Sequence, residues 1–546
     1  MVGTALALAS ACSDSTEPKL PPCTAAGPAL ALAVGQYVAI DPAPVSGCTV
    51  FPATAGASVE YLLVPQSATG TPGKQASFTL TGARLTLPAA AALASGAPSE
   101  VERFHARLRE WEGKGWYGSA PAPARPALRA PPGRPRVGDT LQFSVCADLN
   151  CSRFDLVRAA ARSVGTHLAI FVDVTAPAPP QGLDSTDLNQ LQTLFDTRLY
   201  GVDTAAFGPE SDINADSVVV LLMTSTVNRL VTRQQCDDQG FVAGFFLGAD
   251  LDPAFASDGR FNHREIFYTI VADPDSTLSC AHSRSFVRAL VPVTVIHELQ
   301  HMISLNQHVL LRRGDPEVLW LNEALSHFAE ELGGRSLPLG DPTRRNYFTG
   351  NWFNAYRYLD STFAHFLLPT AGIGSLAERG AQWLFVRYLV DQYAGDTTVT
   401  AWNTFTRRLL ATTQTGAANV DAVTGGEYTL SVTRWALANW VSDLDSVVPG
   451  FTPPPELRYT SWSFRALYDS LHTARQDIFA KPFPLTPAVG VGDSVSLSGT
   501  LHAGSGSYQR VVQASPDSGF TLLFSEGNGS ALPAGVAARL NVIRIR

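Results

Sequence analysis

Short apolar runs near both ends of the chain predict β-strands. The runs QYVAI, CTVF, EYLLVP and SFTLTG fall within residues 24–95, and VSLSGTL, YQRVVQ, FTLLF and RLNVIRIR fall within residues 476–546. Gly, Pro and Ala separate the runs of the first group, as in turns between antiparallel strands. We therefore expect a β-sandwich-like domain in the first region and a second small β domain in the last.

The middle of the chain has a different pattern. From about residue 137, the buried-strand runs TLQFSV, HLAIFVDV and SVVVLLMT occur with a helical segment, DLNQLQTLFDTRLYGVD. Further on, from about residue 340 to 450, apolar residues recur three and four positions apart, which predicts helices. The predicted fold class is multidomain α+β.

A helical stretch, VERFHARLREWEGKGW, and a Pro-rich stretch, GSAPAPARPALRAPPGRPR, separate the first β region from the middle. Prolines favour an extended chain, so the second stretch is interpreted as a linker, with a cleavable propeptide junction as the alternative. The predicted segments are a signal and tether at 1–23, a β-sandwich-like domain at 24–95, helix and linker at 96–136, an α+β lobe at 137–335, a helical lobe at 336–475 and a β domain at 476–546.

Composition indicates a folded protein and excludes one class of partner. Hydrophobic residues make up 45% and charged residues 16% of the 546 positions, unlike a disordered chain. A chain of this length is expected to form several domains. The net charge of -8 offers no basic surface for phosphates, so nucleic acid is not an expected partner.

The first residues, MVGTALALASACSDSTEPK, resemble a bacterial lipoprotein signal. The resemblance implies removal of the segment through Ala11 and lipid attachment at Cys12, which would anchor the protein in the cell envelope. An ordinary secretory signal is the alternative, and both imply export. No uninterrupted apolar run reaches the length of a transmembrane helix.

The other cysteines form an even set, which suits an oxidising compartment. The simplest of the many connectivities joins sequence neighbours. The expected pairs are Cys23 with Cys48, Cys146 with Cys151, and Cys236 with Cys280. A zinc ribbon at the second pair is disfavoured, because the spacing is not C-x-x-C.

The segment Asp212-Ile213-Asn214-Ala215-Asp216-Ser217 spaces its oxygens like a calcium loop. An EF-hand loop needs Gly at its sixth position and Glu at its twelfth. Those positions hold Ser217 and Met223, so a plain turn is favoured and calcium remains a weak prediction.

The segment VPVTVIHELQHMISLN contains the strongest chemical signal. On a helix, residues four apart lie one turn above each other, so His297 and His301 can share one metal ion, with Glu298 beside it. Pro292 suits the first turn of this helix. A catalytic zinc ion needs a third protein ligand. Glu323, on a second predicted helix after a short connection, can supply it.

These two segments resemble the gluzincin clan of zinc metallopeptidases, most closely the hyicolysin-type bacterial family. The resemblance rests on His-Glu-Leu-Gln-His at 297–301 and Trp-Leu-Asn-Glu-Ala-Leu-Ser at 320–326. It implies a gluzincin-like domain in which a sheet and the metal helix adjoin a helical lobe. It also implies that His297, His301 and Glu323 bind zinc, and that Glu298 is the general base and acid for the metal-activated water.

Residues that orient the ligands are implied by the same resemblance. Glu330 would accept the free N–H of a zinc-binding imidazole and fix its orientation. The alternatives are a solvated charge, or Glu331 in that role. His327, one turn after Glu323, is either a further donor or a packed histidine.

The chain departs from the aminopeptidases of this clan. It lacks the Gly-x-Met-Glu-Asn segment that captures a substrate's amino terminus there, so an endopeptidase is expected. It also has Ala377 where those enzymes place an oxyanion-steadying tyrosine. Other tyrosines are candidates, although packing is the expected role of each: Tyr347, Tyr356, Tyr358 and Tyr388.

The sequence therefore predicts a monomeric zinc peptidase that hydrolyses extracellular proteins or peptides and is attached to the membrane through a lipid. We expect REIFYTIVAD to form an edge strand that pairs with extended substrate. The alternative is an inactive surface lipoprotein that binds or adheres and keeps a structural metal site.

Overall fold

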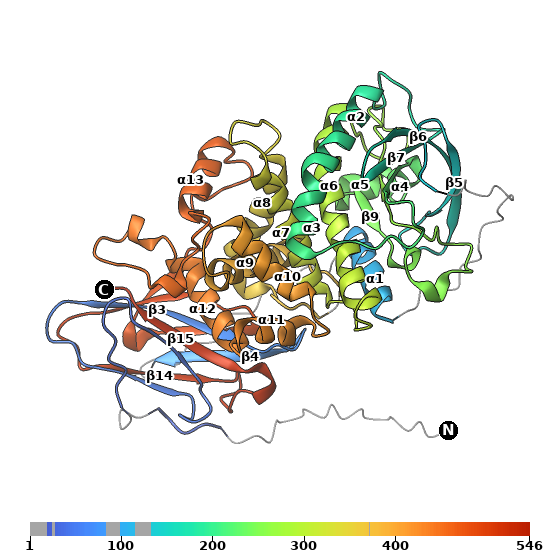
Figure 1. Ribbon diagram of the computed structural model, residues 1–546. Helices are drawn as coiled ribbons and strands as arrows, with labels where there is room; N and C mark the ends of the chain where they lie inside the picture. Colours follow the sequence, from blue (N-terminus) through green and yellow to red (C-terminus); the bar gives the residue numbers. More distant parts are fainter. Residues whose placement is uncertain (1–18, 24–27, 83–98, 115–132, 371) are drawn as a thin grey trace, which may run out of the picture.

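The computed structural model describes residues 19–23, 28–82, 99–114, 133–370 and 372–546. Cys12, the signal region and most of the Pro-rich stretch lie outside these residues. Figure 1 shows three parts of one molecule: a β-sandwich, an α+β lobe on the opposite side, and a helical lobe between them. The coarse prediction of a mixed α+β, multidomain chain is confirmed.

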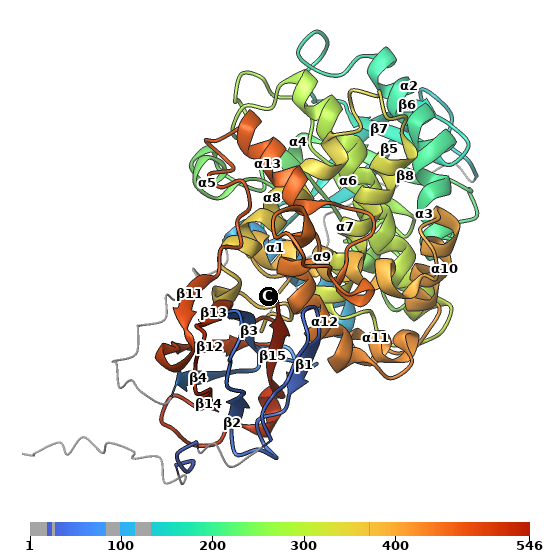
Figure 2. The ribbon, with the colours of Figure 1, turned by 90° about the vertical axis from the view of Figure 1, so that its left-hand side faces the viewer.

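The sandwich consists of two sheets, seen from another side in Figure 2. The five-stranded sheet has the order β1 (Tyr37–Ile40), β15 (Ala538–Arg544), β3 (Val59–Ser67), β13 (Gln509–Gln513) and β11 (Ala488–Val491). The four-stranded sheet has the order β12 (Ser496–His502), β4 (Gln75–Gly82), β14 (Phe520–Ser525) and β2 (Cys48–Phe51).

Both sheets combine strands from the two ends of the chain, which corrects the expectation of two separate β domains. β3 lies between β15 and β13, and β4 lies between β12 and β14. Every residue of β3 is buried. A strand buried on both faces needs a partner on each edge for its backbone groups, and only the C-terminal segment supplies them here. The described strands of the predicted segments 24–95 and 476–546 therefore form one sandwich.

The α+β lobe is built on a six-stranded sheet with the order β5-β6-β7-β8-β10-β9. The inner pairs β7·β8 and β8·β10 are parallel, and the others are antiparallel. The strands are β5 (Thr140–Cys146), β6 (Phe154–Val164), β7 (Leu168–Asp173), β8 (Val219–Met223), β9 (Gly244–Phe246) and β10 (Ile266–Thr269).

The edge strand differs from the one that the sequence predicts. The segment REIFYTIVAD contains β10, which lies inside the sheet between β8 and β9. The edge is β9, three residues long, which the apolar pattern is too short to reveal. β10 is fully buried because it has a neighbour on both sides. Any strand added at this edge has to pair with β9.

Helices cover this sheet and form the second lobe. Those of the α+β lobe are α2 (Ser185–Leu194), a π-helix (Phe195–Leu199), α3 (Tyr200–Phe207), α4 (Ser225–Asn228), α5 (Arg233–Gln239), α6 (Arg284–Leu305) and α7 (Leu319–Ser336). Those of the helical lobe are α8 (Asn346–Asp360), α9 (Leu376–Tyr393), α10 (Val399–Leu410), α11 (Gly416–Thr424), α12 (Tyr428–Val441) and α13 (Phe464–Ala474).

Two further contacts hold the parts together. The sandwich rests on α12, where the hydroxyl of Tyr508 donates to the carbonyl of Ala436 at 2.6 Å and the side chain of Gln66 donates to that of Val432 at 3.1 Å. Helix α1 (Glu100–Lys114), predicted as a helix, packs against α7 and contacts β9 through Phe104 and Arg109 (Figure 1). A segment far upstream in sequence therefore lies next to the metal-binding part of the fold.

The expected disulfide pairs are confirmed: Cys23–Cys48, Cys146–Cys151 and Cys236–Cys280. The bonds indicate an oxidising, exported environment. Across the described ranges, none of the helices combines the length and the apolar character that crossing a membrane requires.

Candidate metal centre

Helix α6 begins earlier than the sequence predicts. Ser283 caps it, with its hydroxyl accepting from the backbone N–H of Phe286 at 3.2 Å. Pro292 therefore lies inside the helix, and the expectation that it occupies the first turn is wrong. Proline has no N–H, so the carbonyl of Arg288, four residues earlier, loses its partner within the helix.

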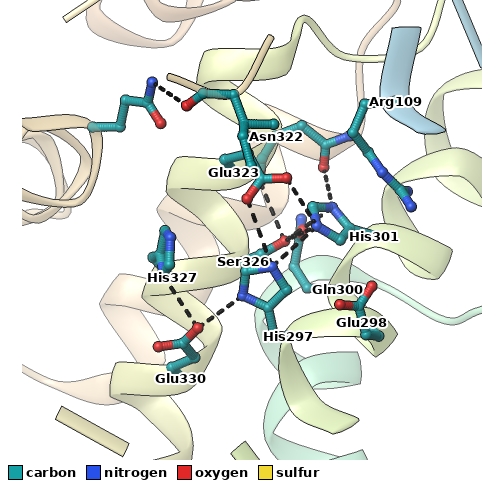
Figure 3. Close-up of polar contacts among 12 residues, drawn as sticks. Arg109, His297, Glu298, Gln300, His301, Asn322, Glu323, Ser326, His327 and Glu330 are labelled. Carbon is teal, nitrogen blue, oxygen red and sulfur yellow. Dashed lines mark hydrogen bonds and ion pairs between the residues drawn. The ribbon is translucent and has the colours of Figure 1, made fainter. Parts of the chain in front are cut away.

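The second half of α6 carries the histidine pair, and α7 carries the carboxylate. A π-helix at Asn306–Leu310 and a short connection turn the chain back, so that α7 packs along α6. Both helix segments are buried here, and their small and apolar residues let the backbones lie close together. His297, His301 and Glu323 consequently face one point between the two helices (Figure 3).

The geometry of this point suits a single metal ion. The Nε2 atoms of His297 and His301 lie 3.2 Å apart. The carboxylate of Glu323 lies 3.7 Å from the first of these nitrogens and 3.4 Å from the second. One donor atom from each residue lies within 4.8 Å of the other two. The three sequence-predicted ligands are brought together, and the group could hold a metal ion.

The opposite nitrogen of each imidazole is held by a hydrogen bond. The Nδ1–H of His297 donates to Glu330 at 2.8 Å, and the Nδ1–H of His301 donates to the amide oxygen of Asn322 at 2.9 Å. A ring with Nδ1 protonated presents the lone pair of Nε2 to a metal. Glu330 also accepts from His327 at 3.1 Å. The carboxylate of Glu330 therefore connects His297 to His327, for which either a further donor or a packed histidine was expected.

The electrostatics of the group favour positive charge. Burial alone would lower the pKa of His297, but the hydrogen bond to Glu330 and the charges of Glu298, Glu330 and Glu323 outweigh burial and raise this pKa to about 9. Burial favours the neutral acid of Glu323, yet the neighbouring imidazoles hold its pKa well below the usual range. Such a site binds a proton or a metal cation at the same atoms, so the residues fit a divalent ion.

Glu298 is held against the edge strand. Its carboxylate accepts from the backbone N–H of Phe246, in β9, at 2.9 Å. The side chain is buried, with 3% of the residue exposed. Glu298 lies on the helix turn between the two histidines, so one contact fixes a carboxylate both beside the metal ligands and beside the strand edge (Figure 3).

Other residues singled out by sequence lie elsewhere. Cys236, Cys280 and His282 group together, but the two sulfurs are already joined to each other. Asp212 accepts from the backbone N–H groups of Asp216 and Ser217, which closes a turn of the favoured kind. The candidate tyrosines are all buried: Tyr347, Tyr356, Tyr358 and Tyr388.

Two residues near the metal group were not predicted. Asn322 precedes the third ligand by one position, and its role depends on how α7 rotates against α6. Arg109 comes from α1, and its charge, together with burial, lowers the pKa of His301. The helical pattern of α1 predicts the helix but carries no signal for its position in the fold.

No known family model matches the chain, and no curated protein is significantly similar to it.

Proposed function

We propose that this protein is a zinc-dependent endopeptidase with a gluzincin-like catalytic domain. One observation carries the proposal: two imidazoles of one helix and a carboxylate of the next converge on one point, with Glu298 beside them and a sheet edge alongside. The His₂Glu donor set with an H-E-x-x-H helix is typical of catalytic rather than structural zinc sites.

The chemistry divides between the metal and the side chains. Zinc, when bound, acts as a Lewis acid toward water and a peptide carbonyl. Glu298 accepts a proton from the attacking water and transfers it to the leaving nitrogen. The N–H of Phe246 donates to one carboxylate oxygen of Glu298, which leaves the other oxygen of Glu298 to exchange the proton. Glu330 and Asn322 keep the two imidazoles in the metal-binding tautomer.

Replacement of the proposed base tests this function. In Glu298→Gln the amide oxygen can still accept from Phe246, so we expect the fold and the bound zinc to remain. Cleavage of casein and of a quenched fluorescent peptide should fall by at least about 100-fold, because general-base catalysis contributes about 10² to 10⁴. Zinc content is measured by elemental analysis, and activity with and without 1,10-phenanthroline.

Glu526→Gln, in the sandwich, is the matched control and should retain activity. Full chelator-sensitive cleavage by Glu298→Gln would exclude Glu298 as the base. Clean wild-type protein that binds no stoichiometric zinc would favour the binding lipoprotein instead.

A further inference from the structure

The outward side of β9 is already occupied in this structure. In the antiparallel pair, the N–H of Ile270 donates to the carbonyl of Ala243, so alternate residues of this strand face β10. Phe246 faces away from β10. Its N–H donates to Glu298, and its carbonyl accepts from the guanidinium of Arg109. An incoming strand that pairs with β9 would need the carbonyl that Arg109 occupies, whereas the N–H stays with Glu298 in the proposed mechanism.

Arg109 attaches α1 to this edge, and Glu112 of the same helix pairs with it. Arg109 lies 2.7 Å from Glu112, and the two side chains are 3% and 2% exposed. The guanidinium also stacks over the ring of Phe246, 5.2 Å from its centre. Gly248 makes room for the pair, because a Cβ there would lie 2.6 Å from Cγ of Glu112. The contacts of Arg109 with the carbonyl and the ring of Phe246 therefore hold α1 against β9.

The same helix contacts both lobes around the metal group. Phe104 meets Phe245 of β9 edge to face at 5.2 Å, and Glu102 lies 3.7 Å from Arg379 of α9. His105, one turn before Arg109, feels the charges of Glu298 and Glu323, which oppose the burial that lowers its pKa to about 4. α1 is therefore held between β9 and α9, next to the metal group (Figure 3).

We propose that α1 is a built-in inhibitor: it occupies the outward edge of β9 beside Glu298, where an extended polypeptide would bind, and substrate enters only when α1 leaves. This inference rests on the proposed function. The inhibitory segment is internal to the chain. The strands before it, β1 to β4, belong to the sandwich and stay in place when α1 is displaced.

Excision of α1 tests the inference. Protease sites inserted within 83–98 and within 115–132 allow the segment to be cut out of the folded, zinc-loaded protein. We expect kcat/KM for an eight-residue fluorescent peptide to rise about 100-fold, the factor for a helix that leaves its place in about 1% of molecules. Protein cut only within 115–132 is the control and should stay latent.

A second measurement does not depend on catalysis. In the cobalt-substituted protein, ligand binding at the metal changes the visible absorption. We expect excision to tighten the Kd of a peptide hydroxamate by the same factor and to change that of acetohydroxamate little, because the small ligand needs no strand edge.

A point variant tests the same inference without removing the helix, in case excision of α1 unfolds the protein. Arg109→Ala removes the contact with Phe246 and should shift both readouts in the same direction by a smaller factor. Arg103→Ala is its control, since Arg103 forms an ion pair with Glu100 within the same helix and is 42% exposed. Lower or unchanged peptide-hydroxamate affinity after excision would show that α1 is part of the working site. Tighter hydroxamate binding without cleavage by any variant would keep this inference and reject the peptidase.

Discussion

Three glutamates near the metal group differ in their partners, and this difference separates their roles. Glu323 lies beside the imidazoles of His297 and His301, so its oxygens remain available for a cation. Glu330 is taken up by His297 and His327. Glu298 is held by a backbone N–H. Glutamates of identical chemistry are thus suited to metal ligation, to orienting an imidazole or to proton transfer, according to the groups from which each carboxylate accepts a hydrogen bond.

Asp203 gives a pH-dependent prediction far from this chemistry. It is fully buried, and among the described residues neither of its carboxylate oxygens has a hydrogen-bond partner. Burial and the charge of Glu210 raise its pKa well above the ordinary value of 3.8. The folded state therefore retains a proton that the unfolded chain releases, so stability falls as pH rises above about 4.

Asp203→Asn replaces the acid with a neutral group of the same shape. We expect the free energy of unfolding to rise by about 1 kcal/mol or more at pH 7, and the gain to disappear below about pH 4. Urea unfolding at several pH values measures it. Asp237→Asn, whose side chain is 62% exposed, should change little. A gain that is largest at low pH would contradict the sign.

At this scale, sequence predicts what is local. The spacing of His297 and His301 depends on one helix, and Glu323 stands in a recognisable segment of the next. Asn322 and Arg109 could not be predicted, because their roles depend on the rotation of α7 and on the docking of α1. The rotation of α7 and the docking of α1 are features of tertiary structure that leave no pattern in the local sequence.

At the scale of elements, α6 combines a functional position with an interior proline. Pro292 lines a cavity of about 380 Å³ together with residues of α2 and α8, so its ring makes incomplete contacts. The histidine pair begins five residues later. The helix therefore carries its weakest hydrogen bonding on the turns that lead into the metal ligands.

Pro292→Ala should stabilise the protein. The new N–H can donate to the carbonyl of Arg288, and this gain outweighs the loss of rigidity in the unfolded chain, so we expect about 1 to 2 kcal/mol in the free energy of unfolding. Chemical denaturation followed by circular dichroism measures the change. The matched control is Pro338→Ala, outside any helix. Destabilisation by Pro292→Ala would mean that ring packing in the cavity exceeds the hydrogen bond.

Element prediction failed where the pattern is short or mixed. β9 has three residues, too few for a period-two signal, and β6 reads FDLVRAAARSV, in which alanines and arginines hide the alternation. The long apolar runs of β3, β7 and β8 were predicted, because burial on both faces leaves an uninterrupted signal.

At the scale of the whole molecule, the two chain ends share one core. The sandwich interior combines residues of both segments, among them Phe51, Phe78, Val511 and Phe524. The residues between β4 and β11 therefore form one long connection that contains both other lobes. Sequence predicted the strands of this sandwich except the short β11, but pairing between segments that far apart leaves no trace in either one.

Cleavage of the chain in the Pro-rich stretch tests this arrangement. After a single cut at a protease site inserted within 115–132, we expect the two fragments to elute together at the size of the intact chain and to separate only in denaturant. Size-exclusion chromatography measures this. An amino-terminal fragment that dissociates in native buffer would contradict the shared sandwich, and uncut protein carrying the same insertion is the control.

The shared sandwich also has a consequence for biosynthesis. β3 is made early, yet its neighbours β13 and β15 leave the ribosome much later. Until then β3 has two open edges and an apolar surface, the condition under which nascent strands aggregate. Export as an unfolded chain would spare the protein this interval in the cytoplasm, because folding could then begin with first and last strands delivered to the same side of the membrane.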